Sequence, residues 1–243
     1  MGTLGKVTGR FVDIHTHVVP SGDDGAQTLE DGIALCASAA RHGTRVLFAT
    51  PHVWPHKPLD AVREQEVRAA YSELARRADI DLRLGFELTP APALLDEDPR
   101  RYRLGGTDAV LMEVPFSGPT DVLWALAEHV EAAGLRPVIA HPERTEAVRA
   151  DPNEAERLAR RGWLLQVNAT SILGSHGEES EELAWRFVEA GLVSLIASDG
   201  HRTTRPPHLD EAYEAVRARL GAGVADSLFD GSALGLAAAA RAA

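Results

Sequence analysis

The 243-residue chain contains a single cysteine, Cys36, so no disulfide can form within it and no cluster of thiolates can hold zinc. No apolar run approaches the roughly 18 residues that a membrane-spanning helix needs. The first eight residues lack the apolar stretch of a secretory signal. These absences predict a protein without a membrane span, and cytoplasmic residence is the simplest expectation.

Basic residues are scarce, and nearly all of them are arginine. The chain has 25 Lys and Arg against 36 Asp and Glu, a net charge of -11, and its only lysines are Lys6 and Lys57. Because duplex binding depends on clustered cations that neutralise phosphates, we expect no nucleic-acid partner. A local positive site for a small anion is still compatible with this composition.

Against these absences stands a recurring pattern of seven short apolar runs, each of which ends in polar residues. The runs span residues 11–17, 45–52, 82–87, 109–113, 137–141, 164–168 and 193–201. Such runs are typical of buried parallel strands. Helix-like segments lie between or after them, near residues 28–42, 59–78, 119–134, 151–161, 178–191, 207–220 and 222–229. This alternation predicts an α/β fold, a distorted seven-stranded TIM-like (β/α) barrel. We expect one domain over residues 1–243, with flexible ends at 1–9 and 234–243.

The polar ends of parallel barrel strands gather on one face, where barrel enzymes build their active sites. His15 and His17 are separated by one residue, so on a strand their side chains point the same way and can hold one cation. The other ends supply imidazoles and carboxylates that suit manganese, iron or zinc better than calcium. These candidates are His52, Glu87, Glu113, His141, Asp199 and His201, with either Asp23 or Asp24 from the loop after His17.

The number of acidic candidates indicates how many cations the site needs. Four carboxylates in one cleft would repel one another strongly without cations. Three divalent ions would bring about +6 against about -4, which leaves a site of about +2 that attracts an anion. Phosphate is the obvious candidate for the reacting group.

The chain resembles the polymerase and histidinol phosphatase (PHP) superfamily, and within it the manganese-dependent bacterial protein-tyrosine phosphatases of capsule and exopolysaccharide systems. The motifs that carry the resemblance are Asp13-Ile14-His15-Thr16-His17, Asp23-Asp24-Gly25, Thr50-Pro51-His52, Gly85-Phe86-Glu87, Ala140-His141-Pro142-Glu143-Arg144, Gln166-Val167-Asn168, Ser198-Asp199-Gly200-His201 and Arg205-Pro206-Pro207-His208. They span almost the whole chain.

The resemblance implies three divalent metal ions, with manganese favoured over iron or zinc. The implied ligands are His15, His17, Glu87 and Asp199 for one ion, Glu87, Glu113 and His141 for a second, and Asp24, His52 and His201 for a third. Counting from His17 favours Asp24, but Asp23 stays an alternative. The resemblance also implies that Arg144 and Arg205 clamp phosphate oxygens, which their planar guanidinium groups suit.

A water that bridges two of these ions would lose a proton near neutral pH, giving a hydroxide that attacks phosphorus. His208 is a candidate donor of the proton to the departing oxygen. The expected substrate is a phosphotyrosine protein, possibly the tail of a bacterial tyrosine kinase, an expectation that comes from the resemblance alone. The sequence leaves the oligomeric state open.

Other functions stay in competition at this point. A histidinol-phosphate or other small-molecule phosphatase would use a similar set of ligands. An amidohydrolase is less compatible, because many such enzymes need a carbamylated lysine in mid-barrel and none follows Lys57. A regulator that binds metal without catalysis is a further alternative. A cysteine phosphatase is disfavoured because only four residues separate Cys36 from Arg41, whereas its signature has five.

Overall fold

The computed structural model describes residues 9–236, whose strands are all parallel and form two sheets. The first sheet has the order β1 (Phe11–Thr16), β2 (Thr44–Ala49) and β4 (Asp81–Leu84). The second has the order β3 (His52–Val53), β5 (Glu87–Leu88), β6 (Ala109–Glu113), β7 (Arg136–Ala140), β8 (Leu164–Asn168) and β9 (Val193–Ala197). The predicted class, an α/β fold with parallel strands, is therefore confirmed.

The predicted count of seven strands was wrong, because two of the predicted strands are each divided between the sheets. Pro51 follows β2 and has no backbone N–H to donate, so the ladder is interrupted before β3 begins at His52. Gly85 interrupts the other run, between β4 and β5. A Cβ at this glycine would lie 2.5 Å from Leu104 Cδ2, so the backbone there packs closer to its neighbour than a side chain allows.

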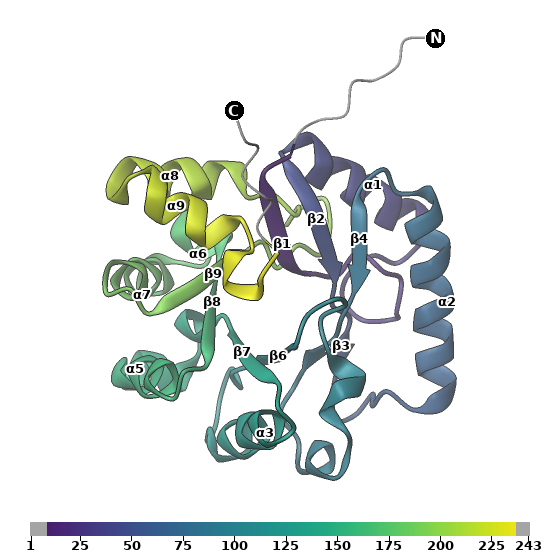
Figure 1. Cartoon of the computed structure of the whole chain (residues 1–243), viewed down its shortest axis with the longest axis horizontal. Coiled ribbons are helices and arrows are strands. Elements are labelled where there is room, and N and C mark those ends of the chain that lie inside the picture. Colours follow the sequence, from purple (N-terminus) through teal and green to yellow (C-terminus); the bar gives the residue numbers. More distant parts are fainter. Residues whose placement is uncertain (1–8, 237–243) are drawn as a thin grey trace.

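Helices surround the strands in Figure 1. They are α1 (Leu29–Arg41), α2 (Ala61–Arg77), α3 (Asp121–Ala132), α4 (Glu146–Ala150), α5 (Asn153–Arg160), α6 (Ala169–Ile172), α7 (Glu178–Glu189), α8 (Asp210–Leu220) and α9 (Ala222–Phe229). All seven predicted helices are present. The short α4 and α6 were not predicted, since one turn of helix carries no readable periodicity. Thr28 caps α1 in a capping box with Asp31, as the polar residue before the apolar pattern indicates.

The connections between β5 and β6 are short 3₁₀ turns, η1 (Pro92–Asp96) and η2 (Pro99–Tyr102), instead of an α-helix. Further 3₁₀ turns are η3 (Pro142–Arg144), directly after β7, and η4 (Ser232–Leu234) near the end of the chain. The η3 turn contains one of the arginines that the sequence motifs singled out.

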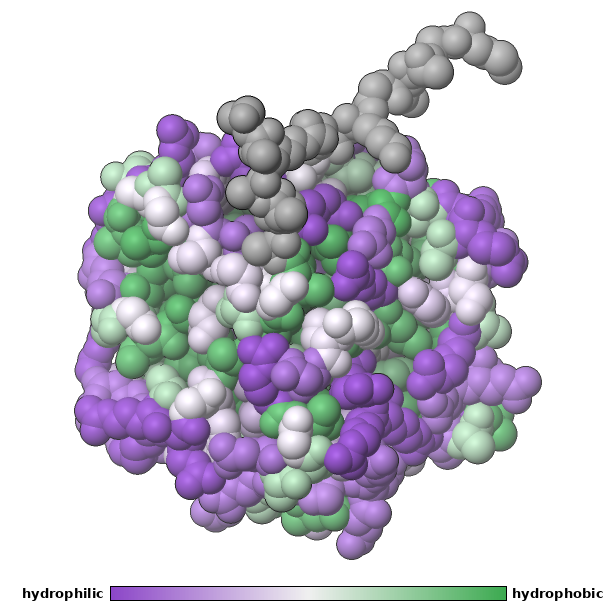
Figure 2. All heavy atoms as spheres, in the orientation of Figure 1, coloured by the Kyte–Doolittle hydropathy of each residue, from purple (hydrophilic) through white to green (hydrophobic). Residues whose placement is uncertain are grey.

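The apolar side chains form two buried layers. One lies between strands and helices, and the other lies on the inner side of the strands, where Val12, Ile14, Phe48 and Leu111 are at most 1% exposed. Leu234, inside the stretch expected to be flexible, is buried in this inner layer. Of the two expected flexible ends, 1–9 and 234–243, residues 1–8 and 237–243 lie outside the described residues. Hydrophilic residues line most of the periphery in the view of Figure 2.

Within residues 9–236, no helix combines the length and the apolar character needed to cross a lipid bilayer.

Candidate metal and phosphate site

The polar residues at the carboxyl ends of the strands meet in one buried cluster. His15 lies on β1, His17 follows it, and Glu87 begins β5. His141 directly follows β7, and Asp199 lies two residues beyond Ala197, where β9 ends. Among residues 9–236 these two are the non-glycine residues with positive φ, 39° and 52°. Such backbone is uncommon outside glycine, although Asp and His adopt it more readily than most residues, and it clusters at functional sites. The two positive φ angles are consistent with local backbone that directs both side chains into the cluster.

Glu87 lies at the centre of this cluster. Its Oε2 is 3.0 Å from His15 Nε2, 3.3 Å from His17 Nε2 and 3.0 Å from His52 Nδ1. Its Oε1 is 3.0 Å from His141 Nε2. Although burial opposes ionisation, the positive potential of His15 and His52 holds the pKa of Glu87 well below its ordinary value. One ionised carboxylate thus faces four imidazoles.

The possible ligand atoms fall into three overlapping groups, within each of which they lie no more than 4.8 Å from one another. The groups are His15, His17 and Asp199; His15, Glu87 and His141; and His17, Asp24, His52 and His201. The groups share His15 and His17, so they delimit one continuous cluster of possible ligand atoms.

The donor atoms of these groups fit divalent cations. The Nε2 atoms of His15 and His17 face each other at 3.2 Å, and both approach the same oxygen of Glu87. That oxygen and His52 Nδ1 are buried, yet the two form no well-aligned hydrogen bond. Buried ring nitrogens and a carboxylate oxygen that converge in this way suit a metal ion, and the mixture of imidazole and carboxylate matches manganese, iron or zinc.

Asp24 and Asp23, which sequence reasoning could not separate, lie at different distances from the cluster. Asp24 Oδ1 is 3.2 Å from His201 Nε2 and 3.5 Å from His52 Nε2. Asp23 instead accepts hydrogen bonds from the backbone N–H of Gly25 and of His52, and it faces His17 Nδ1, the far side of that ring, at 3.5 Å. The structure therefore brings Asp24 among the ligand atoms and puts Asp23 behind one of them.

Glu113 is near the cluster but belongs to none of the three groups found in the described part of the chain. The hydroxyl of Thr89 donates a hydrogen bond to its Oε1. Burial, together with the negative charge of Glu87, raises the pKa of Glu113 to about 8. Without a cation this carboxyl is mostly protonated at neutral pH, and a neighbouring divalent ion would favour its ionised form.

Two amide side chains of β8 contact two of the candidate ligands, although sequence reasoning assigned these amides no role. Gln166 Oε1 lies 3.0 Å from His15 Nδ1, and Asn168 Nδ2 donates to Asp199 Oδ2 at 2.9 Å. Gln166 Nε2 also donates to Asn168 Oδ1. Such outer partners fix the rotation of ligand side chains. In the sequence, the position of Gln166 and Asn168 at the end of an apolar run could have indicated that they lie beside the site.

Both candidate phosphate-binding arginines reach the cluster. Arg144 Nη1 donates to Asp199 Oδ2 at 2.8 Å, and Arg205 Nη2 lies 3.8 Å from Asp199 Oδ1. Their side chains are 17% and 27% exposed, so part of each guanidinium group is open to a ligand.

His208 is not brought together with these groups. Its Nε2 lies 2.8 Å from Ser38 Oγ on α1, and its ring stacks on His42 with centroids 3.5 Å apart. Ser38 lies on α1 and His42 caps the end of this helix, so neither partner belongs to the cluster. A part for His208 in proton transfer stays a prediction that this placement does not support.

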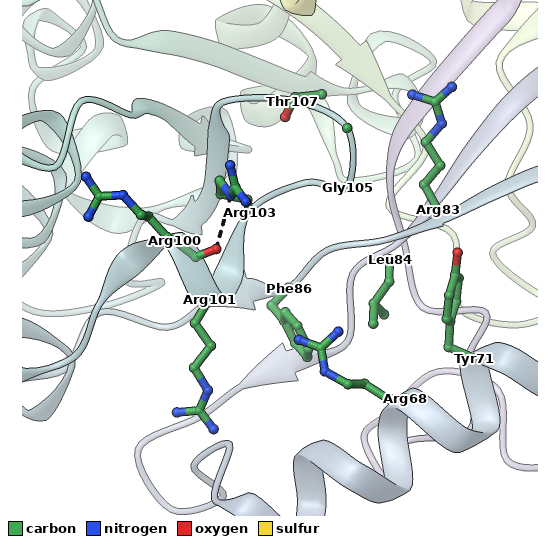
Figure 3. A pocket seen from close by; sticks show the side chains of 11 residues that line it. Arg68, Tyr71, Arg83, Leu84, Phe86, Arg100, Arg101, Arg103, Gly105 and Thr107 are labelled. Atoms are coloured by element: carbon green, nitrogen blue, oxygen red, sulfur yellow. Dashed lines mark hydrogen bonds between the residues drawn. The ribbon is translucent and has the colours of Figure 1, made fainter.

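A cavity of about 720 Å³ lies between α2 and the segment before β6, and no candidate ligand lines it (Figure 3). Five arginines contribute to its wall: Arg68, Arg83, Arg100, Arg101 and Arg103. Glu64 pairs with two of them, and Asp81 and Asp98 pair with two others. Because carboxylates already compensate most of this charge, we assign the cavity no part in the chemistry.

Cys36 lies on α1 with 1% of its surface exposed, and burial raises the pKa of its thiol to about 12. A thiolate nucleophile is therefore unavailable near neutral pH. We predict that Cys36→Ser retains kcat/KM for an aryl phosphate to within about two-fold, because no covalent cysteinyl step is needed. Steady-state assays at matched thermal stability test this, and complete loss of turnover in a folded variant would reject hydrolysis at the histidine and carboxylate cluster.

Comparisons with known proteins agree with this geometry. The profile of the capsular polysaccharide synthesis family CpsB/CapC matches residues 11–235. The tyrosine-protein phosphatase YwqE of Bacillus subtilis is 33% identical over 223 residues, which cover 87% of this chain and 85% of that protein. The tyrosine-protein phosphatase CpsB of Streptococcus agalactiae is 27% identical over 232 residues, covering 90% and 95% of the two chains.

A solved structure is similar over most of the fold. It comes from a study of YwqE from Bacillus subtilis and CpsB from Streptococcus pneumoniae, described as metal-dependent tyrosine phosphatases. The TM-score is 0.80 at 30% sequence identity, and the match covers 88% of this chain and 89% of the other.

Proposed function

Because the chain belongs to the CpsB/CapC family of capsular polysaccharide synthesis proteins, we propose that it is a metal-dependent protein-tyrosine phosphatase. The observation that carries the proposal is the convergence of five imidazoles, three carboxylates and two arginines from distant segments around Glu87 and Asp199. The names of its relatives supply the substrate class, a phosphotyrosine protein.

We propose three divalent ions, with manganese favoured over iron or zinc. The ligands would be His15, His17, Glu87 and Asp199 for one ion, Glu87, Glu113 and His141 for a second, and Asp24, His52 and His201 for a third. Glu87 would be shared between two ions, since its two oxygens face different imidazoles. Glu113 would join His141 and Glu87 after losing its proton. Bound divalent ions supply a nucleophile at neutral pH by lowering the pKa of water, and they neutralise charge on the phosphoryl group.

Side chains of this chain would bind the phosphate and orient the metal ligands. Arg144 and Arg205 would bind the phosphate oxygens and stabilise the charge that spreads over them during transfer. The hydrogen bond to Asp199 holds Arg144 toward the cluster. Gln166 and Asn168 would keep His15 and Asp199 in place. A tyrosyl leaving group, with a pKa of about 10, needs less protonation than an alkyl alcohol, so a strong proton donor is not required.

We propose that the two sheets close into the distorted TIM-like barrel predicted from the sequence. Two contacts across the ends support closure: the backbone N–H of Asp199 donates to the carbonyl of His15, and that of His17 donates to the carbonyl of Gly200. We further propose cytoplasmic residence and the tail of a bacterial tyrosine kinase as the substrate segment.

Turnover of a phosphotyrosine peptide and of histidinol phosphate, each with and without added manganese, tests the proposed activity. We expect manganese-dependent release of phosphate and a higher kcat/KM for the peptide. A preference for histidinol phosphate would instead identify a small-molecule phosphatase of the wider superfamily. Absence of phosphate release from both substrates would reject phosphatase activity and favour a regulator without catalysis.

A further inference from the structure

The apolar ring of Phe116, at the edge of the candidate metal and phosphate site, is unusually exposed for a phenylalanine side chain. Phe116 lies in the loop between β6 and α3 and is 46% exposed. Among the large hydrophobic residues of the described chain, those that are exposed are Val62, Phe116, Leu173 and Val224. Phe116 is the aromatic member of this set. An exposed aromatic ring beside a site frequently marks a surface that a ligand covers.

Phe116 contacts the two parts of the site that follow β7. Its ring stacks on the imidazole of His141 with centroids 5.6 Å apart and planes inclined by 17°. The guanidinium carbon of Arg144 lies 5.0 Å from the centre of the same ring. The exposed ring is thus a direct neighbour both of a candidate metal ligand and of a candidate phosphate-binding arginine.

The backbone around Phe116 is tied to the same segment. Its carbonyl oxygen accepts a hydrogen bond from the N–H of Glu146 at 3.0 Å, where α4 begins. This bond joins the loop after β6 to the residues that follow Arg144. The position of the ring is consequently set relative to the phosphate-binding arginine, as a substrate platform requires.

We propose that Phe116 is the specificity-determining residue that stacks against the phenyl ring of the substrate and so favours aryl over alkyl phosphates. The inference rests on the proposed phosphatase function. A phosphate held by Arg144 brings the group attached to it beside this guanidinium, next to the Phe116 ring. An aryl group can cover the exposed surface and gain a ring–ring contact, whereas a short alkyl group cannot.

Trp54 is the other aromatic residue at the cluster, and it is less suited to this part. Its ring already stacks on His52, with centroids 4.6 Å apart, and on His56, at 5.2 Å. Trp54 is also only partly exposed. Both rings contact a candidate metal ligand, so exposure separates them: Phe116 is 46% exposed, whereas Trp54 is less exposed.

Equilibrium binding of phenylphosphonate and methylphosphonate to the manganese-loaded protein tests the proposal without turnover. The two probes carry the same anionic group and differ in the ring. We expect Phe116→Ala to weaken phenylphosphonate about five-fold while methylphosphonate changes less than about two-fold, as expected for loss of one aromatic pair. Phe116→Tyr should restore the preference, and Val224→Ala, an exposed hydrophobic residue on α9, should leave both affinities unchanged.

The ratio of the two affinities separates this role from others. Equal weakening of both probes in Phe116→Ala would show that the ring acts only by supporting Arg144, and would overturn the proposal. Unchanged affinities for both probes would overturn it as well. Because nearly half of the Phe116 side chain is exposed, Phe116→Ala should fold. The melting temperature and the metal content of the variant verify this.

The proposed function is tested separately by turnover of the phosphotyrosine peptide by the unaltered protein. If that turnover fails while the ring preference is still lost in Phe116→Ala, the catalytic assignment is wrong and the aryl-binding platform stands. If turnover is present and the preference does not depend on Phe116, the platform is wrong and the catalytic assignment stands.

Discussion

Replacing Glu87 by glutamine is expected to lower kcat/KM for a phosphotyrosine peptide by about a thousand-fold, because loss of the proposed shared metal ligand would raise the barrier by several kcal/mol. The substitution keeps the shape of the side chain and removes its charge. Glu87 is fully buried and faces four imidazoles, so the neutral amide leaves these rings without their common carboxylate. We expect the bound metal to fall together with the rate.

The matched control for this variant is Glu154→Gln on α5. Glu154 is also a buried carboxylate, but its partners are Thr120, Trp124 and Arg157, away from the cluster. It should keep both metal content and turnover, apart from a modest loss of thermal stability. If Glu87→Gln retained the normal metal content and rate, Glu87 would be needed neither for metal binding nor for catalysis.

Replacing Arg144 by lysine is the second large effect, a loss of about a hundred-fold in kcat/KM, the size seen when one preorganised donor to a developing anion is removed. Lysine keeps the positive charge but not the planar fork that binds two oxygens. Arg144 also bonds Asp199 and lies against Phe116, and a single ammonium group cannot hold both contacts in the same geometry. Steady-state kinetics should show the loss mainly in kcat.

Arg149→Lys provides the control in the neighbouring helix α4. Arg149 pairs with Glu179 and bonds Ser180, so its contacts are with α7 and not with the cluster. Its kinetic constants should stay unchanged. A fall confined to KM in Arg144→Lys would mean that this arginine only captures the substrate, and an unaltered rate would remove it from the mechanism.

The arrangement of the fold was largely predictable because apolar runs and helical periodicity alternate along the chain. The division of two runs was not, since it depends on local backbone packing. Pro51 interrupts a ladder that the apolar pattern continues through, and Gly85 permits a close contact with Leu104, a residue distant in sequence. The hydrophobic periodicity indicates which face of a strand is buried, but it does not indicate where one run is divided between two sheets.

The candidate site was predictable where a ligand ends a strand. His15, Glu87, His141 and Asp199 all lie at or near the end of an apolar run in the sequence, and the structure brings them together. The finer assignments depend on contacts across the fold. Asp23 and Asp24 are adjacent in one loop, and only the positions of His52 and His201 distinguish them.

Residues outside the strand ends were harder to assign from sequence. His208 belongs to a matching motif, yet its ring packs on α1 through Ser38 and His42. Phe116 gave no signal, because a single aromatic residue in a loop has no periodic context. Its significance appears only when the ring is found beside Arg144.

The central claim is that imidazoles and carboxylates from distant segments hold divalent ions that the reaction needs. Elemental analysis of the purified protein, with phosphotyrosine turnover measured on the same sample before and after chelation, tests this claim most directly. We predict about three divalent ions per chain, the number that balances the acidic ligands, loss of turnover on their removal, and recovery with manganese. Full turnover in protein shown to be free of metal would contradict the account.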